Sequence, residues 1–216
     1  MNLDIDLSVA ELLASRLCHD LVGPIGAVAN GMELMADDEF GMADDALQLA
    51  SNAAAQATHL LQFYRLAYGL AGSRMSGDLQ EIRKLSQDML SHGKCSLDWS
   101  AMAAGGVSLP DGAAKLLLNM IALATEGLPR GGVLSVAVGD GDPARIEVGA
   151  NGQDAGFHDE VRAGLDEAIA LDALTPRNVH AHFTRLVAQR IGATLQVEGP
   201  VGDQLRLSAS LPGSAV

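Results

Sequence analysis

Apolar residues in the first third of the chain recur at three- and four-residue steps, the spacing of one face of an α-helix. The first series is Leu13, Leu17, Leu21, Ile25 or Pro24, Val28, Met32 and Met35. Asp37, Asp38 and the region of Gly41 interrupt it. A second series then follows in strict three-four alternation: Leu47, Ala50, Ala54, Ala57, Leu61, Tyr64 and Tyr68. The pattern predicts a hairpin of two long helices within residues 1–74.

The apolar surface of such a hairpin is more than its two helices can cover by themselves. Alanines in the second series let helix backbones approach closely, so two hairpins can pair into a four-helix bundle. This favours a homodimer. The alternative is that the hairpin packs onto the C-terminal half of its own chain, because helix packing satisfies either arrangement.

The pattern changes after the glycine-rich stretch 69–77 and predicts a second domain over residues 75–216. Helices are expected at 78–92, 110–126, 155–171 and 176–191. Strands are expected at 95–102, at 133–138 and 145–148 joined by a turn at 139–142, and at 194–198 and 204–211. This order predicts an α+β fold in which helices lie against one face of an open sheet.

Composition and charge exclude several classes of function. The 216 residues are 48% hydrophobic and 19% charged, which is enough for one substantial core or two small ones. The formal net charge of −13 disfavours nucleic acid, whose phosphates bind clusters of Lys and Arg. No run of about 18 apolar residues and no basic amphipathic helix indicates a membrane contact.

The start of the chain and its cysteines indicate the compartment. The first residues are acidic and lack the basic region of a signal peptide, so we expect a cytoplasmic protein. Cys18 and Cys95 are too few for a disulfide framework and are expected to be reduced thiols.

The candidate chemistry lies in the segment 15–25, where His19 and Asp20 are adjacent and Pro24 follows. Each helical residue advances by about 100 degrees, which places His19 well away from the Leu17 and Leu21 stripe. Pro24 should bend the helix just beyond His19. The residues predicted to share the face of His19 are Ser15, Arg16, Gly23, Gly26 and Asn30.

This face is polar or nearly bare, which favours contact with another protein. A glycine inside a helix costs up to about 1 kcal/mol against alanine, so Gly23 and Gly26 need a reason to be there. Small residues beside a histidine let a partner approach it. We therefore interpret Ser15, Gly23, Gly26 and Asn30 as a docking floor.

The segment Arg16–Asp20 with Pro24, followed by this order of elements, resembles the bacterial histidine phosphotransferases of the ChpT kind. These are similar to the dimerisation and catalytic halves of a histidine kinase, and the resemblance covers nearly the whole chain. It implies a degenerate histidine-kinase-ATPase-like α/β sandwich domain over 75–216. It also implies that His19 is phosphorylated and that Asp20 orients the ring or accepts its proton. Arg16 is placed either to meet phosphate oxygens or to form a salt bridge.

The second domain departs from the kinase pattern at three places where kinases bind ATP. Kinases have two asparagines four residues apart and a later lysine, where this chain has Asn119, Leu123 and Glu126. Ala150 falls where kinases have an aspartate for adenine, and the stretch 175–180 has no glycine. Leucine offers magnesium no oxygen, and a carboxylate repels triphosphate. We expect no ATP, cofactor or metal ion to bind this chain.

The resemblance therefore implies a histidine phosphotransferase in a two-component phosphorelay. His19 would accept a phosphoryl group from a receiver domain of a hybrid histidine kinase and pass it to an aspartate of a response regulator, with Mg²⁺ supplied by the receiver. Two alternatives stay open: a pseudokinase adaptor that docks receivers without phosphotransfer, and an active ATP-dependent kinase. The remaining histidines are expected to be structural or surface residues: His59, His92, His158, His180 and His182.

Overall fold

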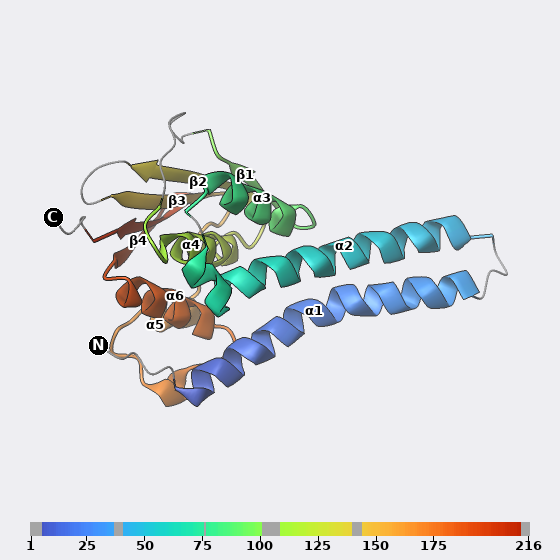
Figure 1. Ribbon diagram of the computed structural model, residues 1–216, viewed down its shortest axis with the longest axis horizontal. Helices are drawn as coiled ribbons and strands as arrows, with labels where there is room; N and C mark the ends of the chain where they lie inside the picture. The colour runs from blue at the N-terminus through green and yellow to red at the C-terminus, as the bar shows by residue number, and fades with distance from the viewer. Residues whose placement is uncertain (1–5, 37–40, 76, 101–108, 140–143, 213–216) are drawn as a thin grey trace.

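The protein combines a long helical hairpin with an α/β domain (Figure 1). The computed structural model describes residues 6–36, 41–75, 77–100, 109–139 and 144–212. The antiparallel helices α1 (Leu7–Ala36) and α2 (Ala43–Ala67) form the predicted hairpin. The interruption expected at Asp37 and Asp38 lies outside the described residues.

The second domain follows a short 3-10 helix, η1 (Leu70–Arg74), so the predicted boundary at residue 75 falls between η1 and α3. Its helical elements are α3 (Leu79–Leu90), α4 (Ala113–Glu126), α5 (Asp159–Gly164), the 3-10 helix η2 (Leu171–Ala173) and α6 (Val179–Arg190). Its strands are β1 (Cys95–Asp98), β2 (Gly132–Gly139), β3 (Arg145–Asn151), β4 (Thr194–Val201) and β5 (Gln204–Ser210).

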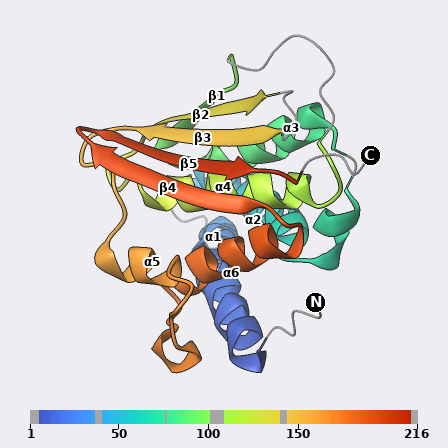
Figure 2. The ribbon, with the colours of Figure 1, turned by 90° about the vertical axis from the view of Figure 1, so that its left-hand side faces the viewer.

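The five strands form one mixed sheet in the order β1-β2-β3-β5-β4. β1 pairs with β2 in parallel, and the other neighbours are antiparallel. α3, α4 and α6 lie on one face of the sheet, and Figure 2 shows no helix against the opposite face of the described sheet. The predicted α+β fold with helices on one face is confirmed. α4 lies in the middle of the core, where nearly all of its residues are buried.

Two elements of the second domain are shorter than predicted. The helix expected over 155–171 stops at Gly164, where a Cβ would lie 2.4 Å from the carbonyl oxygen of Asn178. The Asp166 carboxylate then accepts a hydrogen bond from the Ala168 amide and stabilises a turn instead. The strand expected over 95–102 ends at Asp98, and residues 101–102 lie outside the described residues, as do 140–142 of the predicted turn.

Neither predicted apolar series is buried along its whole length within one chain. In α2 the buried alanines are Ala46, Ala50, Ala53 and Ala67, whereas Leu47 and Leu61 are about half exposed. In α1, Pro24 is buried, but Ile25 and Met32 are exposed. In α2 the predicted series alternates between buried positions such as Ala50 and Tyr64 and exposed positions such as Leu47 and Leu61, so it follows the border of the buried face and not its middle. Each helix has a second apolar face that α1–α2 packing does not cover.

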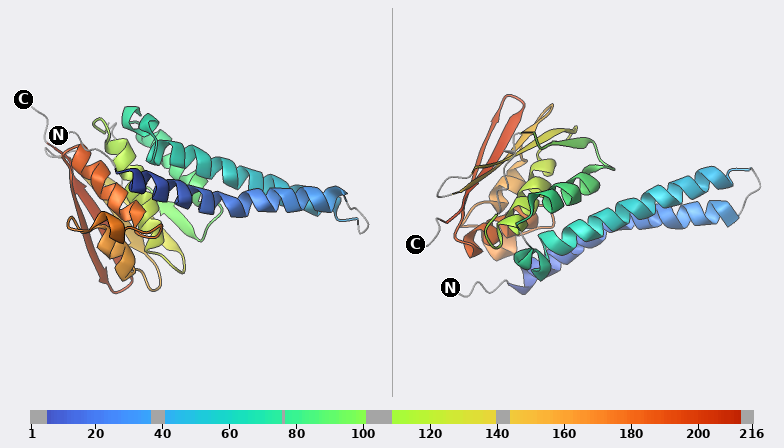
Figure 3. Two further views of the ribbon diagram at one scale, coloured as in Figure 1. Left: turned by 90° about the horizontal axis from the view of Figure 1, so that it is seen from below. Right: turned by 45° about the horizontal axis from the view of Figure 1, so that its top comes forward.

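Only the base of the hairpin packs on the second domain. Val9, Leu13, Phe63 and Leu66 belong to the same buried core as α4. The far half of the hairpin projects away from the domain with no other described element beside it, as the two views of Figure 3 show. The alternative in which the hairpin packs onto its own C-terminal half therefore holds for its base alone.

By length and composition, the 30-residue α1 is long and apolar enough to cross a bilayer. This corrects the expectation that no segment of the chain meets that criterion. Core helices of soluble proteins meet it too, so it does not by itself place α1 in a membrane. In the structure α1 packs along α2 over the length of the hairpin.

Candidate functional site

His19 lies on an open face of α1, with 89% of its side chain exposed. Ser15, Gly23, Gly26 and Asn30 are also exposed. A Cβ built at Gly23 or Gly26 would meet no atom within 4 Å. The structure thus leaves four of the five predicted docking residues free for contact on the helix of His19. Pro24 lies inside α1, and the helix continues past it to Ala36.

Asp20 connects His19 to the second hairpin helix through its two carboxylate oxygens. Its Oδ1 lies 3.3 Å from Nδ1 of His19, and its Oδ2 accepts a 2.6 Å hydrogen bond from the hydroxyl of Tyr64. Burial, the nearby Tyr68 and the Asp20 carboxylate itself raise the pKa of Tyr64, so its hydroxyl stays a donor. Sequence reasoning placed Tyr64 in an apolar seam and missed this contact.

Arg16 joins α1 to the second domain and is itself mostly buried. Its Nη2 lies 2.7 Å from Oε1 of Glu126, and the same oxygen lies 2.6 Å from Nδ1 of His180. Burial lowers the pKa of Arg16, but the charges of Glu126 and its neighbours outweigh burial and raise it overall. Of the two roles predicted for Arg16, the structure shows the salt bridge.

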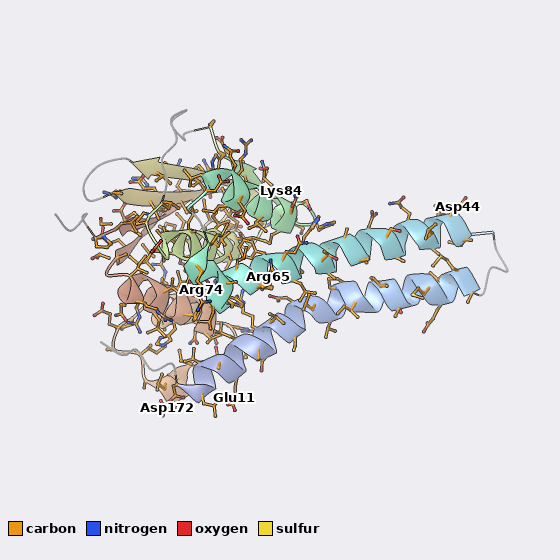
Figure 4. The ribbon with its side chains drawn as sticks, viewed as in Figure 1. Glu11, Asp44, Arg65, Arg74, Lys84 and Asp172 are labelled. Atoms are coloured by element: carbon orange, nitrogen blue, oxygen red, sulfur yellow. The ribbon has the colours of Figure 1, made fainter. Side chains whose placement is uncertain are left out.

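A cleft separates the His19 face from the second domain. Its walls are formed on one side by Ser15, Arg16, His19 and Asp20, and on the other by Glu126, His158, Glu160, Val161, Pro176 and Arg177. Figure 4 shows the same end of the molecule, with Glu11 of α1 and Asp172 of η2 there and Asp44 at the opposite tip of the hairpin. A visiting protein that reaches His19 would therefore approach both domains.

Three α4 side chains stand where kinases have ATP-binding residues. In this protein they pack or form bonds inside the chain. Asn119 is fully buried, and its amide donates to the carbonyl oxygens of Ala67 and Lys115, at 2.7 and 2.8 Å. Leu123 is fully buried, and Glu126 is held by Arg16 and His180. Leu123 offers a nucleotide-bound metal no ligand atom, the unpartnered Oδ1 of Asn119 is buried, and Oε1 of Glu126 already contacts Arg16 and His180.

Of the remaining histidines in the described part of the chain, only His158 lines the cleft, and neither cysteine lines it. The described part of the chain contains no cluster of three or more His, Cys, Asp or Glu side chains arranged for a metal ion. His180 and His182 are buried, and the His59 and His92 rings lie 5.4 Å apart. Sequence reasoning missed the role of His180, since nothing in the local sequence marks its partner Glu126. The Cys18 and Cys95 thiols are free.

Comparisons with known proteins agree on the family. The family model for the histidine phosphotransferase C-terminal domain matches residues 79–201, more than half of the chain. The protein phosphotransferase ChpT of Brucella abortus (strain 2308) is 32% identical over 212 residues, which cover 94% of this chain and 97% of that protein.

Solved structures extend the likeness to the hairpin. A bacterial phosphotransferase superposes with a TM-score of 0.81 at 29% identity, covering 96% of this chain and 98% of the other. The Acinetobacter baumannii histidine kinase AdeS shares the fold, with a TM-score of 0.52 at 12% identity over 91% of this chain and 98% of the other. The family match over the second domain and the similarity to ChpT along nearly the whole chain show that the chain belongs to the histidine phosphotransferases of the ChpT kind.

Proposed function

We propose that this chain is a phosphorelay intermediate that carries a phosphoryl group on His19 between two receiver domains. The donor is a phosphoaspartate on the receiver of a hybrid histidine kinase, and the acceptor is an aspartate of a response regulator. The observation that carries this proposal is an exposed imidazole whose Nδ1 faces a carboxylate. That arrangement leaves Nε2 available as the attacking atom.

The chemistry is an in-line displacement at phosphorus. The lone pair of Nε2 forms the new N–P bond while the bond from phosphorus to the aspartate oxygen breaks, and the electron pair returns to that carboxylate. Asp20 holds or accepts the proton of Nδ1, which limits the positive charge on the phosphorylated ring. Transfer to the response regulator reverses these steps. Mg²⁺ comes with the acidic pocket of each receiver.

We infer that ATP takes no part. The support is the occupied region of α4, where Asn119, Leu123 and Glu126 all serve packing or internal bonds. In this respect the second domain is a pseudokinase domain that braces α1.

A homodimer follows from the far half of the hairpin. The exposed apolar side chains there include Val22, Ile25, Met32, Leu34, Leu47 and Leu49, and the exposed Leu61 lies nearer the base of α2. On α1, Val22 and Ile25 are separated by three residues and Met32 by seven more, so they lie along one side of the helix. A second copy of the hairpin covers such a surface as a four-helix bundle.

The homodimer is tested by sedimentation of the Ile25→Glu and Leu61→Glu variants. Each charge in the buried bundle should convert the dimer to a monomer, whereas the exposed polar change Gln48→Glu on α2 should leave the dimer intact. A monomeric wild-type chain at the same concentration would contradict the homodimer.

The proposed transfer is tested by mixing the chain with a radiolabelled phosphoreceiver in the absence of ATP. We expect an acid-labile label on the wild-type chain and none on His19→Gln, which should keep the wild-type fold because the side chain is exposed. Label on His19→Gln would move the phosphorylation site elsewhere. Stable docking of the receiver with no label on either chain would favour the adaptor that binds receivers without transfer.

This role belongs in the cytoplasm, where receivers of hybrid kinases and response regulators meet. It needs no contact with nucleic acid, in keeping with the net charge of −13.

A further inference from the structure

We propose that Tyr64 is a positioning residue for phosphoryl acceptance: its hydroxyl fixes the Asp20 carboxylate so that His19 keeps its proton on Nδ1 and presents Nε2. The proposal rests on the proposed role of His19 as the phosphorylated residue. It adds a third residue, from the second helix of the hairpin, to the adjacent pair on α1.

The geometry shows how one carboxylate serves two helices. Tyr64 of α2 donates to Oδ2 of Asp20 at 2.6 Å, while Oδ1 of the same group lies 3.3 Å from Nδ1 of His19. The carboxylate is planar, so a bond that fixes one oxygen also fixes the position of the other. Adjacent residues on a helix diverge by about 100 degrees, which makes the contact between Asp20 and His19 depend on one side-chain conformation of Asp20.

Tyr64 is itself held in place. Only 9% of the residue is exposed, its ring stacks on Tyr68 with centroids 4.9 Å apart, and it meets Phe63 edge-on at 6.0 Å. Its raised pKa keeps the hydroxyl protonated across the working range of the protein. The 89% exposed imidazole of His19 has no such support of its own. The fixed position of the buried Tyr64 therefore restricts the Asp20 carboxylate, and through it the exposed ring of His19.

No other described side chain takes this role. The nearby charged groups have their own partners: Arg16 pairs with Glu126, and Glu126 also contacts His180. Among the described residues, the Asp20 carboxylate has hydrogen-bond contacts with His19 and Tyr64 only.

Tyr68 offers a matched control. It lies one turn along α2 and stacks on Tyr64. Its buried hydroxyl makes no aligned hydrogen bond among the described groups, and the Arg16 guanidinium lies near it. Tyr68→Phe thus removes a hydroxyl from the same aromatic stack and leaves the hydrogen bonds of Asp20 unchanged. Tyr64→Phe removes the hydroxyl that contacts Asp20.

The test combines nitrogen NMR of the His19 ring with the rate of label transfer from a phosphoreceiver, using the full chain. In the wild type we expect the ring to be protonated mainly on Nδ1. Tyr64→Phe should mix the two tautomers and slow transfer about tenfold, while Tyr68→Phe should change neither. In an Asp20→Asn background, Tyr64→Phe should have no further effect on the rate.

Unchanged tautomers and rate in Tyr64→Phe, or equal losses in Tyr64→Phe and Tyr68→Phe, would overturn the proposal and leave His19 as the phosphorylated residue. Failure of the wild-type chain to gain any label at His19 would refute the proposed function instead. The tautomer measurement needs no phosphoryl group, so the two failures are distinct.

Discussion

The face around His19 and the region around Glu126 lie on opposite sides of one cleft. Polar groups of the first, such as His19, are exposed, whereas those of the second form bonds within the protein. On α1, the His19 side chain is 89% exposed, and the glycines beside it meet nothing within 4 Å. On α4, Asn119 and Glu126 are bonded within the protein. A group that the chain leaves free is available to a partner, whereas a group that the chain satisfies has become part of the fold. The contrast supports the proposal that the chemistry lies on the hairpin and that the second domain supports it.

The largest expected effect is a loss of stability on the α4 side of the cleft, at Glu126. Glu126→Gln leaves the Arg16 guanidinium without its counter-ion and weakens the acceptor for the buried His180. We expect the free energy of unfolding to fall by about 3 kcal/mol, because one partner of a mostly buried pair is lost. Urea denaturation measures it.

The control for that change is Glu160→Gln, which disturbs a longer, more exposed ion pair with Arg177. It should cost less than about 1 kcal/mol. Equal stability of Glu126→Gln and the wild type would show that the contacts of Glu126 with Arg16 and His180 do not stabilise the fold.

The second effect concerns the inside of the hairpin. A Cβ at Gly31 would lie 2.9 Å from both the carbonyl oxygen of Ala46 and the Cβ of Ala50, so Gly31→Val forces α1 and α2 apart. We expect a loss of about 2 kcal/mol in the free energy of unfolding. Calorimetric unfolding checks it, and a wild-type melting temperature would contradict the close helix packing.

The third effect tests the open side. Gly26→Arg places a long side chain on the face of His19 at a position where its Cβ meets no atom within 4 Å. We expect label transfer to fall by about tenfold, equal to about 1.4 kcal/mol, while the free energy of unfolding stays within about 1 kcal/mol of the wild type. Stopped-time label assays against one receiver measure the rate. Normal transfer would remove Gly26 from the docking surface.

The smallest effect has the opposite sign. Gly26→Ala adds only a methyl group at an open helical position, so it should raise the free energy of unfolding by about 0.5–1 kcal/mol and leave transfer unchanged. Urea titrations should compare Gly26→Ala with Gly31→Ala. The added methyl group at Gly31 would press against α2, so only that variant should be less stable than the wild type. A loss of stability in Gly26→Ala would mean that the face is covered.

Local patterns in the sequence predicted much of the fold and the exposed position of His19. The hairpin, the order of helices and strands, and the open face of His19 each depend on spacing within a few turns of one element. The two apolar faces of α2 could not be separated, because exposed Leu61 and buried Ala50 fit the same three-four series.

The supporting contacts were not predictable from spacing. Tyr64 and Asp20 are 44 residues apart, and Arg16 and Glu126 are 110 apart. Such pairs form only when α2 folds back along α1 and α4 packs against the hairpin. No local sequence pattern indicates these long-range contacts. The sequence marked Glu126 only as a charge that repels triphosphate, and the structure adds its contacts with Arg16 and His180.

The most direct measurement compares two phosphoryl donors for the purified wild-type chain. Labelled ATP with Mg²⁺ and no second protein should give neither calorimetric binding nor label, whereas a labelled phosphoreceiver should transfer its label to His19 within the same period. Tight ATP binding followed by self-labelling of His19 would contradict the account.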